Sequence, residues 1–338
     1  MTLNSLWFIF IGILYAGFFV LEGFDFGVGI LLPFLGKNDL QRRTIINTIG
    51  PHWDGNEVWL ITAGGATFAA FPEWYATLFS GFYLPLFLIL IGLIVRGVAF
   101  EFRSKDDHPL WRSFWDWCLC LGSIIPTILF PVAFSNLVRG IPIDANMQYV
   151  GGFFYLLNPF ALLASFAVTL LIIMHGASFL SLKTTGEIEQ KARALVRWLW
   201  LLVVLVLLIF LITSVIVTDV RERLSVFSIG FPVVALVAIL SAGYFLRKGQ
   251  FGRFFVMTCI TVAFFVFTIF GMLYPRVMVS SLNPEWSLTI QNAASSPYTL
   301  KLMTTVTLIF LPIVLIYQAW TYWIFRKRLA GDPKKLTY

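Results

Sequence analysis

Long apolar runs alternate with short polar segments along the whole chain. Nine runs of roughly twenty residues are long enough to cross the hydrocarbon core of a bilayer as helices. They fall at 6–33, 51–72, 78–101, 114–137, 155–181, 198–218, 226–246, 254–275 and 302–325. The second is the least apolar, because Gly64, Gly65 and a polar start dilute it. The pattern lacks the alternation of β-barrel strands and predicts an all-α polytopic membrane protein.

Composition supports the membrane assignment. The chain is 59% hydrophobic and 12% charged, about half the charge of an ordinary soluble domain, and its mean hydropathy is +0.86. The N-terminal segment lacks the basic start and the cleavage site of a signal peptide, so we expect a retained first helix. Cys118, Cys120 and Cys259 all lie in apolar runs and are expected to be small buried side chains.

The Lys and Arg residues predict the orientation. With nine spans, one side of the membrane carries 18 of them and the other side 5, with Arg96 inside a span. The positive-inside rule then places the N-terminus outside and the C-terminus in the cytoplasm, and it explains the net charge of +7 without nucleic-acid binding. We expect two four-helix bundles, over 1–140 and 141–280, followed by an external loop, a peripheral ninth helix and a basic tail over 281–338.

Two acidic pairs interrupt the first two apolar runs. Glu22 and Asp25 stand three residues apart among Gly23, Gly27 and Gly29, and the glycines predict close packing against another helix. Asp25 lies about 15 Å from the cytoplasmic end of its helix, where an ionisable group is by default a functional candidate.

Asp54 and Glu57 form the second pair, at the start of the second run, where the helix dipole alone could explain acidic residues. His52 beside them is undecided between helix-end chemistry and function. Arg96, in the third run, either snorkels to the interface or pairs with Asp54 or Asp25. Asp54, Arg96 and the deeper Asp25 together would make a proton-entry path from the cytoplasm, whereas Glu57, like His52, is undecided. Asp116 is expected to be an acid of the first turn of the fourth helix, with an accessory role as the alternative.

Intrinsic haem or metal ligation is not expected. Of the three histidines, His108 lies in a loop, His52 at a helix start and His175 alone in the fifth run, so no pair could face a haem. The segment "PHWDGNE" lacks the repeated spacing of a metal site. The residues by themselves leave two classes open, a proton-coupled transporter and a haem-less subunit of a larger complex.

Several motifs resemble subunit II of the cytochrome bd-type quinol oxidases. They are "GFDFGVGILLPFLG", "INTIGPHWDGNEVWLITAGGATFAAFP", "FSGFY", "FRSK", "WRSFWDW" and "LLNPFALLA", all within the first 165 residues. The later helices match in layout and hydropathy.

The resemblance implies a respiratory terminal oxidase of the prokaryotic cell membrane that oxidises quinol and reduces oxygen to water. It implies a partner subunit I that carries the b- and d-type haems, and a small single-helix accessory subunit as a further candidate partner. It also implies roles in a proton path for Asp25, Asp54 and Arg96, which match the family's motif residues. Glu22 stands where a relative has Asp, so an acid is kept at that position. Some relatives hold a structural quinone in subunit II. The runner-up is a secondary transporter using Asp25 and Asp54, disfavoured because the polar cluster lies on one side and in the first half only.

Overall fold

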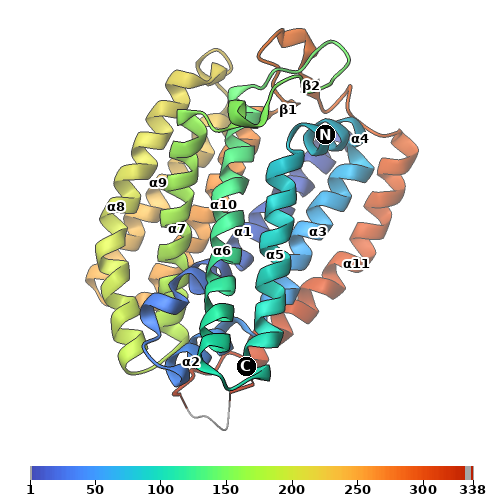
Figure 1. Cartoon of the computed structure of the whole chain (residues 1–338). Helices are drawn as coiled ribbons and strands as arrows, with labels where there is room; N and C mark the ends of the chain where they lie inside the picture. The colour runs from blue at the N-terminus through green and yellow to red at the C-terminus, as the bar shows by residue number, and fades with distance from the viewer. Residues whose placement is uncertain (1, 332–335, 338) are drawn as a thin grey trace.

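The structure, a computed structural model, describes residues 2–331 and 336–337. Lys334 and Lys335, counted above in the basic tail, lie outside the described residues. Long helices run side by side through the molecule (Figure 1). They are α1 (Leu3–Leu35), α2 (Asp39–Ile49), α3 (Trp53–Ala70), α4 (Pro72–Gly81), α5 (Tyr83–Phe102), α6 (Pro109–Arg139), α7 (Pro159–Lys183), α8 (Glu187–Val217), α9 (Val226–Arg247), α10 (Phe251–Leu273) and α11 (Pro297–Ile324). Short 3-10 turns cover Arg103–Lys105, Phe153–Leu156, Asp219–Arg221 and Pro284–Trp286, and strands β1 (Arg276–Met278) and β2 (Leu288–Thr289) pair antiparallel.

The all-α membrane fold is confirmed. Within the described residues, eight helices are long and apolar enough to cross a membrane: α1, α5 (extended to Lys105) and α6 to α11. The predicted span 51–72 is also helical, as α3, but it is not among the eight. Its passage through the membrane therefore stays a prediction, as do the sidedness and the division into two bundles. Figure 1 shows α3 between α1 and α11, running from the end that holds the C-terminus toward the end that holds the N-terminus.

Two predicted boundaries were wrong. The apolar run 78–101 begins inside α4, and Phe82 separates that helix from α5. The loop expected after the first span contains α2, a short helix capped by the Asn38 side chain, which accepts a hydrogen bond from the Gln41 amide. Its six buried residues, Thr44 to Ile49, pack against the bundle, so the segment is too polar to span but amphipathic enough to fold onto the protein.

Local sequence explains where several of the helices begin. Asn158 and Ser296 accept hydrogen bonds from backbone amides of the first turns of α7 and α11, and a proline follows each of them. A proline in the first turn costs no hydrogen bond, because the amide it lacks would have no partner inside the helix. These caps fix the entry of both helices at the end that also holds the sheet.

The glycines of α1 bring it against α7, as the spacing predicted. A Cβ on Gly27 would collide with the carbonyl oxygen of Ile172 and lie 2.9 Å from the Cα of Gly176. A Cβ on Gly23 would lie 2.7 Å from the Ile172 side chain, and one on Gly29 would collide with Ser123 of α6. Only glycine permits this backbone approach, so the acidic face of α1 is buried in protein rather than exposed to lipid.

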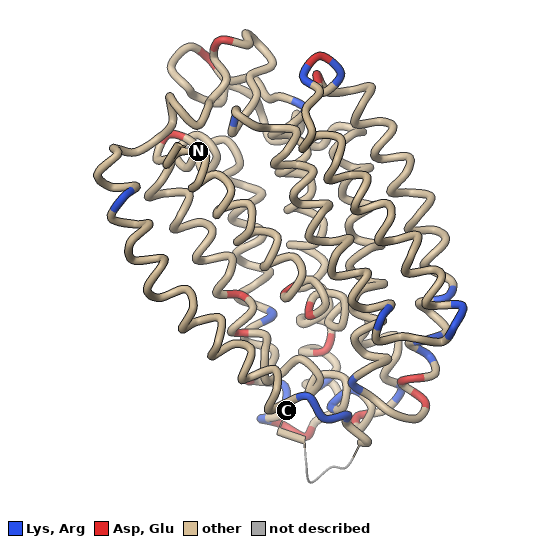
Figure 2. Tube along the Cα trace, turned by 180° about the vertical axis from the view of Figure 1, so that it is seen from behind, with Lys and Arg blue, Asp and Glu red and all other residues tan. Residues whose placement is uncertain are grey.

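The two ends of the bundle differ in charge. Figure 2 shows most of the described Lys and Arg residues gathered at the end that holds the C-terminus, here called the basic end. At the opposite end the Arg276 guanidinium of β1 donates two hydrogen bonds to Asp219, at 2.6 and 2.9 Å. This bidentate pair ties the α8–α9 connection to the small sheet.

Candidate functional site

Four ionisable side chains from three helices meet inside the bundle. Glu22 and Asp25 come from α1, Glu57 from α3 and Arg96 from α5, and we call them the acid–arginine cluster. Arg96 Nη1 lies 2.6 Å from Glu22 Oε1 and 2.7 Å from Glu57 Oε1. The side chains of Arg96 and Glu22 have no exposed surface in the chain, and Glu57 is 21% exposed. One arginine thus bridges two carboxylates at a depth where none of the three could stand alone.

Aromatic rings close the cluster from the surrounding membrane. The Arg96 guanidinium carbon lies 5.1 Å from the centre of the Phe26 ring, 5.4 Å from Phe100 and 5.9 Å from a Trp53 ring. The rings favour a cation over their faces and exclude lipid.

Of the two alternatives for Arg96, the structure rejects snorkelling and keeps pairing. The partners expected for it, Asp54 and Asp25, were wrong, because the rotation of α1 and α3 about their axes presents Glu22 and Glu57 to it instead.

Asp25 is held by a separate set of hydrogen bonds. Its Oδ2 accepts one from Asn56 Nδ2 at 2.7 Å, and Asp25 has no exposed surface. The oxygen of the same amide, Asn56 Oδ1, accepts from Tyr322 Oη at 2.8 Å and from Gln318 Nε2 at 3.3 Å. Trp59 Nε1 in turn donates to Gln318 Oε1 at 2.8 Å. We call Asn56, Trp59, Gln318 and Tyr322 the α11 clasp.

The α11 clasp fixes which way the Asn56 amide points. Its oxygen receives two donors from α11, so its nitrogen must face Asp25 and the Leu21 carbonyl. Sequence analysis missed Asn56, Gln318 and Tyr322. Polar residues inside the apolar spans 51–72 and 302–325 could have marked these positions as candidates. The sequence does not indicate, however, that the two spans are neighbours.

Several polar atoms of the cluster have no partner in the described part of the protein. Glu22 Oε2, Asp25 Oδ1, Arg96 Nε and Arg96 Nη2 are buried and have no hydrogen-bond partner among the described residues. Buried polar atoms of this kind are normally satisfied by internal water, and a chain of such waters conducts protons. Water molecules at these atoms would link the carboxyl groups of the cluster by hydrogen bonds.

Asp54 and His52 lie between this cluster and the basic end. Asp54 is exposed in the first turn of α3, and its Oδ1 accepts a hydrogen bond from the Gly55 amide at 2.7 Å. Glu57 follows one turn later and contacts Arg96. His52 is buried, and its ring stacks on Tyr322 with the centres 4.3 Å apart. Of the predicted site residues, Glu22, Asp25, Glu57 and Arg96 are together, and Asp54 marks the exposed approach.

Asp116 does not belong to the cluster, and the first-turn assignment was wrong. Helix α6 begins at Pro109, so Asp116 lies two turns inside, where it is 1% exposed. It accepts hydrogen bonds from Arg103 Nε at 2.6 Å and from Arg42 Nη1 at 2.9 Å. Arg42, Arg103 and Asp116 form an ion-pair network at the basic end. Because this network joins α2 to α6, its geometry supports a structural role.

The histidines offer no facing pair for a haem. His175 is buried, its Nδ1 lies 2.8 Å from Thr258 Oγ1, and its Nε2 lies 3.0 Å from the Val20 carbonyl. His108 is exposed in a loop, and the His52 ring stacks on Tyr322, with Nδ1 left without a hydrogen-bond partner among the described residues. Within the described residues no group of three or more His, Cys, Asp or Glu is placed to hold a metal ion.

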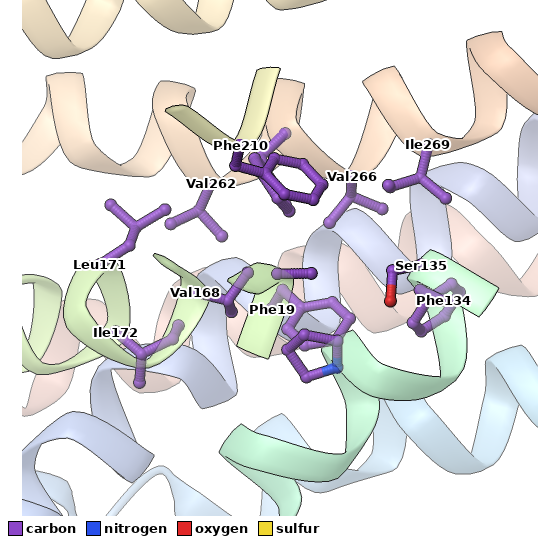
Figure 3. A pocket seen from close by; sticks show the side chains of 13 residues that line it. Phe19, Phe134, Ser135, Val168, Leu171, Ile172, Phe210, Val262, Val266 and Ile269 are labelled. Atoms are coloured by element: carbon purple, nitrogen blue, oxygen red, sulfur yellow. The ribbon is translucent and has the colours of Figure 1, made fainter. Parts of the chain in front are cut away.

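An apolar pocket lies deeper in the bundle, among α1, α6, α7, α8 and α10. Figure 3 shows Phe19, Val168, Phe210 and Val266 around it, with Ser135 at one side. Ser135 is the one polar side chain of its lining. Its cavity of about 30 Å³ has room for one or two water molecules. The lining supplies neither an imidazole nor a thioether as a haem ligand.

The fold and the cluster define a multi-pass helical membrane protein that carries a group of buried acids bridged by an arginine. The family model described as "Cytochrome bd terminal oxidase subunit II" matches residues 3–325. The chain belongs to this family and is a multi-pass protein of the cell membrane.

Individual relatives agree along the whole chain. It is 45% identical over 337 residues to cytochrome bd ubiquinol oxidase subunit 2 of Bacillus subtilis, covering 100% of this chain and 99% of that protein. It is 38% identical over 371 residues to cytochrome bd-I ubiquinol oxidase subunit 2 of Escherichia coli, covering 98% and 96%. A chain of the bd oxidase structure from Geobacillus thermodenitrificans matches with a TM-score of 0.78 over 97% of this chain and 100% of that chain, at 18% identity, which shows the shared fold.

Proposed function

We propose that this chain is the haem-less subunit of its oxidase, stabilises the haem-bearing subunit I and lets protons enter the complex from the cytoplasmic side. As a member of its family it is part of a quinol:oxygen oxidoreductase of the respiratory chain, a haem-containing complex with a partner subunit I. A secondary transporter is not supported, because family and relatives agree over the full length.

The haem-less assignment is supported by a test of fit. A b- or d-type haem needs at least one axial side chain that faces a space as wide as the macrocycle. Both ring nitrogens of His175 lie at hydrogen-bond distance from other groups. The His52 ring stacks on Tyr322, and although its Nδ1 has no partner among the described residues, the apolar pocket is lined by neither histidine and, at about 30 Å³, is far too small. The residues of this chain therefore do not fit a haem, and we assign the b- and d-type haems to subunit I. A structural quinone and a single-helix accessory subunit stay proposals without an assigned position.

The observation that carries the proton-path role is the bridging of Glu22 and Glu57 by buried Arg96. From exposed Asp54, Glu57 is one helical turn along α3, and it contacts Arg96. Arg96 contacts Glu22, which lies one turn from Asp25 on α1. These groups form a line that leads from the basic end into the protein. Among the described residues, polar atoms without hydrogen-bond partners lie along this line, and water molecules could bind to them. Arg96 keeps negative charge in the cluster tolerable, so the acids can exchange protons without unfolding it.

The face formed by α3 and α11 is where we place subunit I. Only 6% of the most apolar stretch of α11 is buried inside this chain. On α3, a Cβ on Gly64 or Gly65 would meet nothing within 4 Å among the described residues. Helix α3 is not apolar enough to be counted among the membrane spans, and its glycines leave a flat surface that no described side chain of this chain covers. Such a surface suits close packing against a helix of a protein partner. A proton leaving Asp25 would then have a short route to the partner.

The test compares Asp25→Asn and Asp54→Asn in the purified complex. We expect both variants to keep the haem spectrum and to slow quinol-dependent oxygen uptake, with the larger loss for buried Asp25. Glu285→Gln, an exposed acid outside the spans, is the matched control and should leave turnover unchanged. Wild-type turnover in both path variants would show that the acids are structural.

A further inference from the structure

A cleft opens at the basic end between α8 and α9. Arg197 and Trp200 of α8 line one side, and Gly243, Leu246 and Arg247 of α9 line the other. Lys248 and Gly249, which follow α9, complete it. Its volume of about 590 Å³ lies within the range of roughly 300–1,000 Å³ that small-molecule sites occupy.

The walls of the cleft are held rigidly. Trp200 Nε1 donates a hydrogen bond to the Ile239 carbonyl at 2.8 Å, and a Cβ on Gly243 would collide with the indole ring. The glycine therefore lets the tryptophan lie flat against α9. Gly249 has φ of +67°, which turns the chain sharply from α9 into α10 and leaves Arg247 and Lys248 at the mouth.

The cations of the cleft have no acidic partners. Arg197, Arg247 and Lys248 are exposed, and none forms an ion pair with a described residue. By contrast, Lys191 and Arg193, earlier on α8, pair with Glu187 and Glu189. No Asp or Glu occurs over residues 190–218 or 223–284, so nothing in α8 after its first turn, or in α9 and α10, offsets this positive charge.

Apolar surface continues from the cleft toward the middle of the membrane. Leu201 and Leu205, one and two turns after Arg197 on α8, are 65% and 54% exposed. Leu240, two turns before Arg247 on α9, is 47% exposed. Lys248 Nζ lies 4.5 Å from the centre of the Tyr244 ring, with the amphipathic placement typical of the membrane interface. A ligand that fits has an anionic head and long hydrocarbon chains.

We propose that this cleft binds the phosphate headgroup of an anionic glycerophospholipid, of the phosphatidylglycerol or diphosphatidylglycerol class. The three cations hold the phosphate, and the leucines of α8 and α9 contact the acyl chains. Basic pockets between helices on the cytoplasmic side are the kind of site that such headgroups occupy. A free phosphate ion shares the head chemistry but has nothing to place on the leucines.

The experiment titrates the delipidated oxidase complex with lipid and counts bound molecules by native mass spectrometry. Arg247→Gln/Lys248→Gln is compared with wild type, and Arg326→Gln/Lys327→Gln, an equally exposed Arg–Lys pair at the end of α11, is the matched control. We expect phosphatidylglycerol to bind the cleft variant on the order of 25-fold more weakly, since each basic residue contributes about a factor of five. The control should bind as wild type does, and phosphatidylcholine should bind weakly to all three.

Three results would overturn the proposal: unchanged phosphatidylglycerol binding in the cleft variant, equal binding of phosphatidylcholine to wild type, or displacement of the lipid by equimolar inorganic phosphate. The last result would assign the cleft to a free anion. If the double variant does not assemble, Arg197→Gln decides the question, with an expected weakening of about fivefold.

Discussion

Replacing Arg96 by leucine should destabilise the complex by about 3 kcal/mol. Removal of one partner of a buried ion pair typically costs about 3–5 kcal/mol, because the charge left behind has neither water nor a counter-ion. Glu22 has no exposed surface and would bear this cost in full, whereas Glu57 is 21% exposed and can rehydrate in part. We therefore expect the lower end of the range.

The assay is the temperature at which the native haem spectrum of the purified complex is lost, at one fixed heating rate because unfolding of such complexes is irreversible. Arg96→Leu should lower this temperature clearly. Glu22→Gln combined with it should recover part of the loss in this temperature, since the amide needs no counter-charge. Lys105→Leu, an exposed cation in the turn after α5, is the control and should behave as wild type. A single variant as stable as wild type, or a double variant no better than the single, would refute the assignment of Arg96 as a buried counter-ion.

Three further predictions test other parts of the molecule. Tyr322→Phe removes one donor from the α11 clasp and should cost about 1 kcal/mol and slow oxygen uptake; equality with wild type in both would remove the clasp from the mechanism. Gly27→Ala should lower thermal stability, because α1 and α7 cannot separate cheaply, whereas Gly230→Ala, with nothing within 4 Å among the described residues, should be neutral or slightly stabilising. Burial raises the pKa of Asp219, but the hydrogen bonds and charge of Arg276 outweigh it and hold that pKa below its ordinary value. A lowered folded-state pKa gives stability that is present above about pH 4 and lost as the pH falls further. Asp219→Asn should therefore lower the melting temperature at pH 7, and the difference in melting temperature between this variant and wild type should become smaller in acid. A difference in melting temperature that does not change with pH would contradict the ion pair.

Much of the fold could be predicted because its signals are local. An apolar run of about twenty residues must form a helix in lipid, since each backbone group has to be bonded within its own segment. The glycines around Asp25 predicted a close helix contact for a similarly local reason, because only glycine permits that approach. Asp25 itself was recognisable as a candidate, since its depth in an apolar helix has no structural explanation of its own.

The partners of the charged groups could not be predicted, because they depend on how whole helices are rotated and placed. Arg96 meets Glu22 and Glu57 rather than Asp25 and Asp54, although the members of each acidic pair are only three residues apart. Three residues correspond to a rotation of about 300° around a helix axis, and hydropathy does not fix the remaining 60°. The α11 clasp joins positions more than 250 residues apart, and the buried position of Asp116 depended on where α6 begins. The sequence by itself determined that the chain is a bundle of membrane helices, and it predicted which ionisable residues lie within them. Only the tertiary structure decided which of those residues touch, because in lipid the helices form independently and their side-chain contacts are set afterwards by packing.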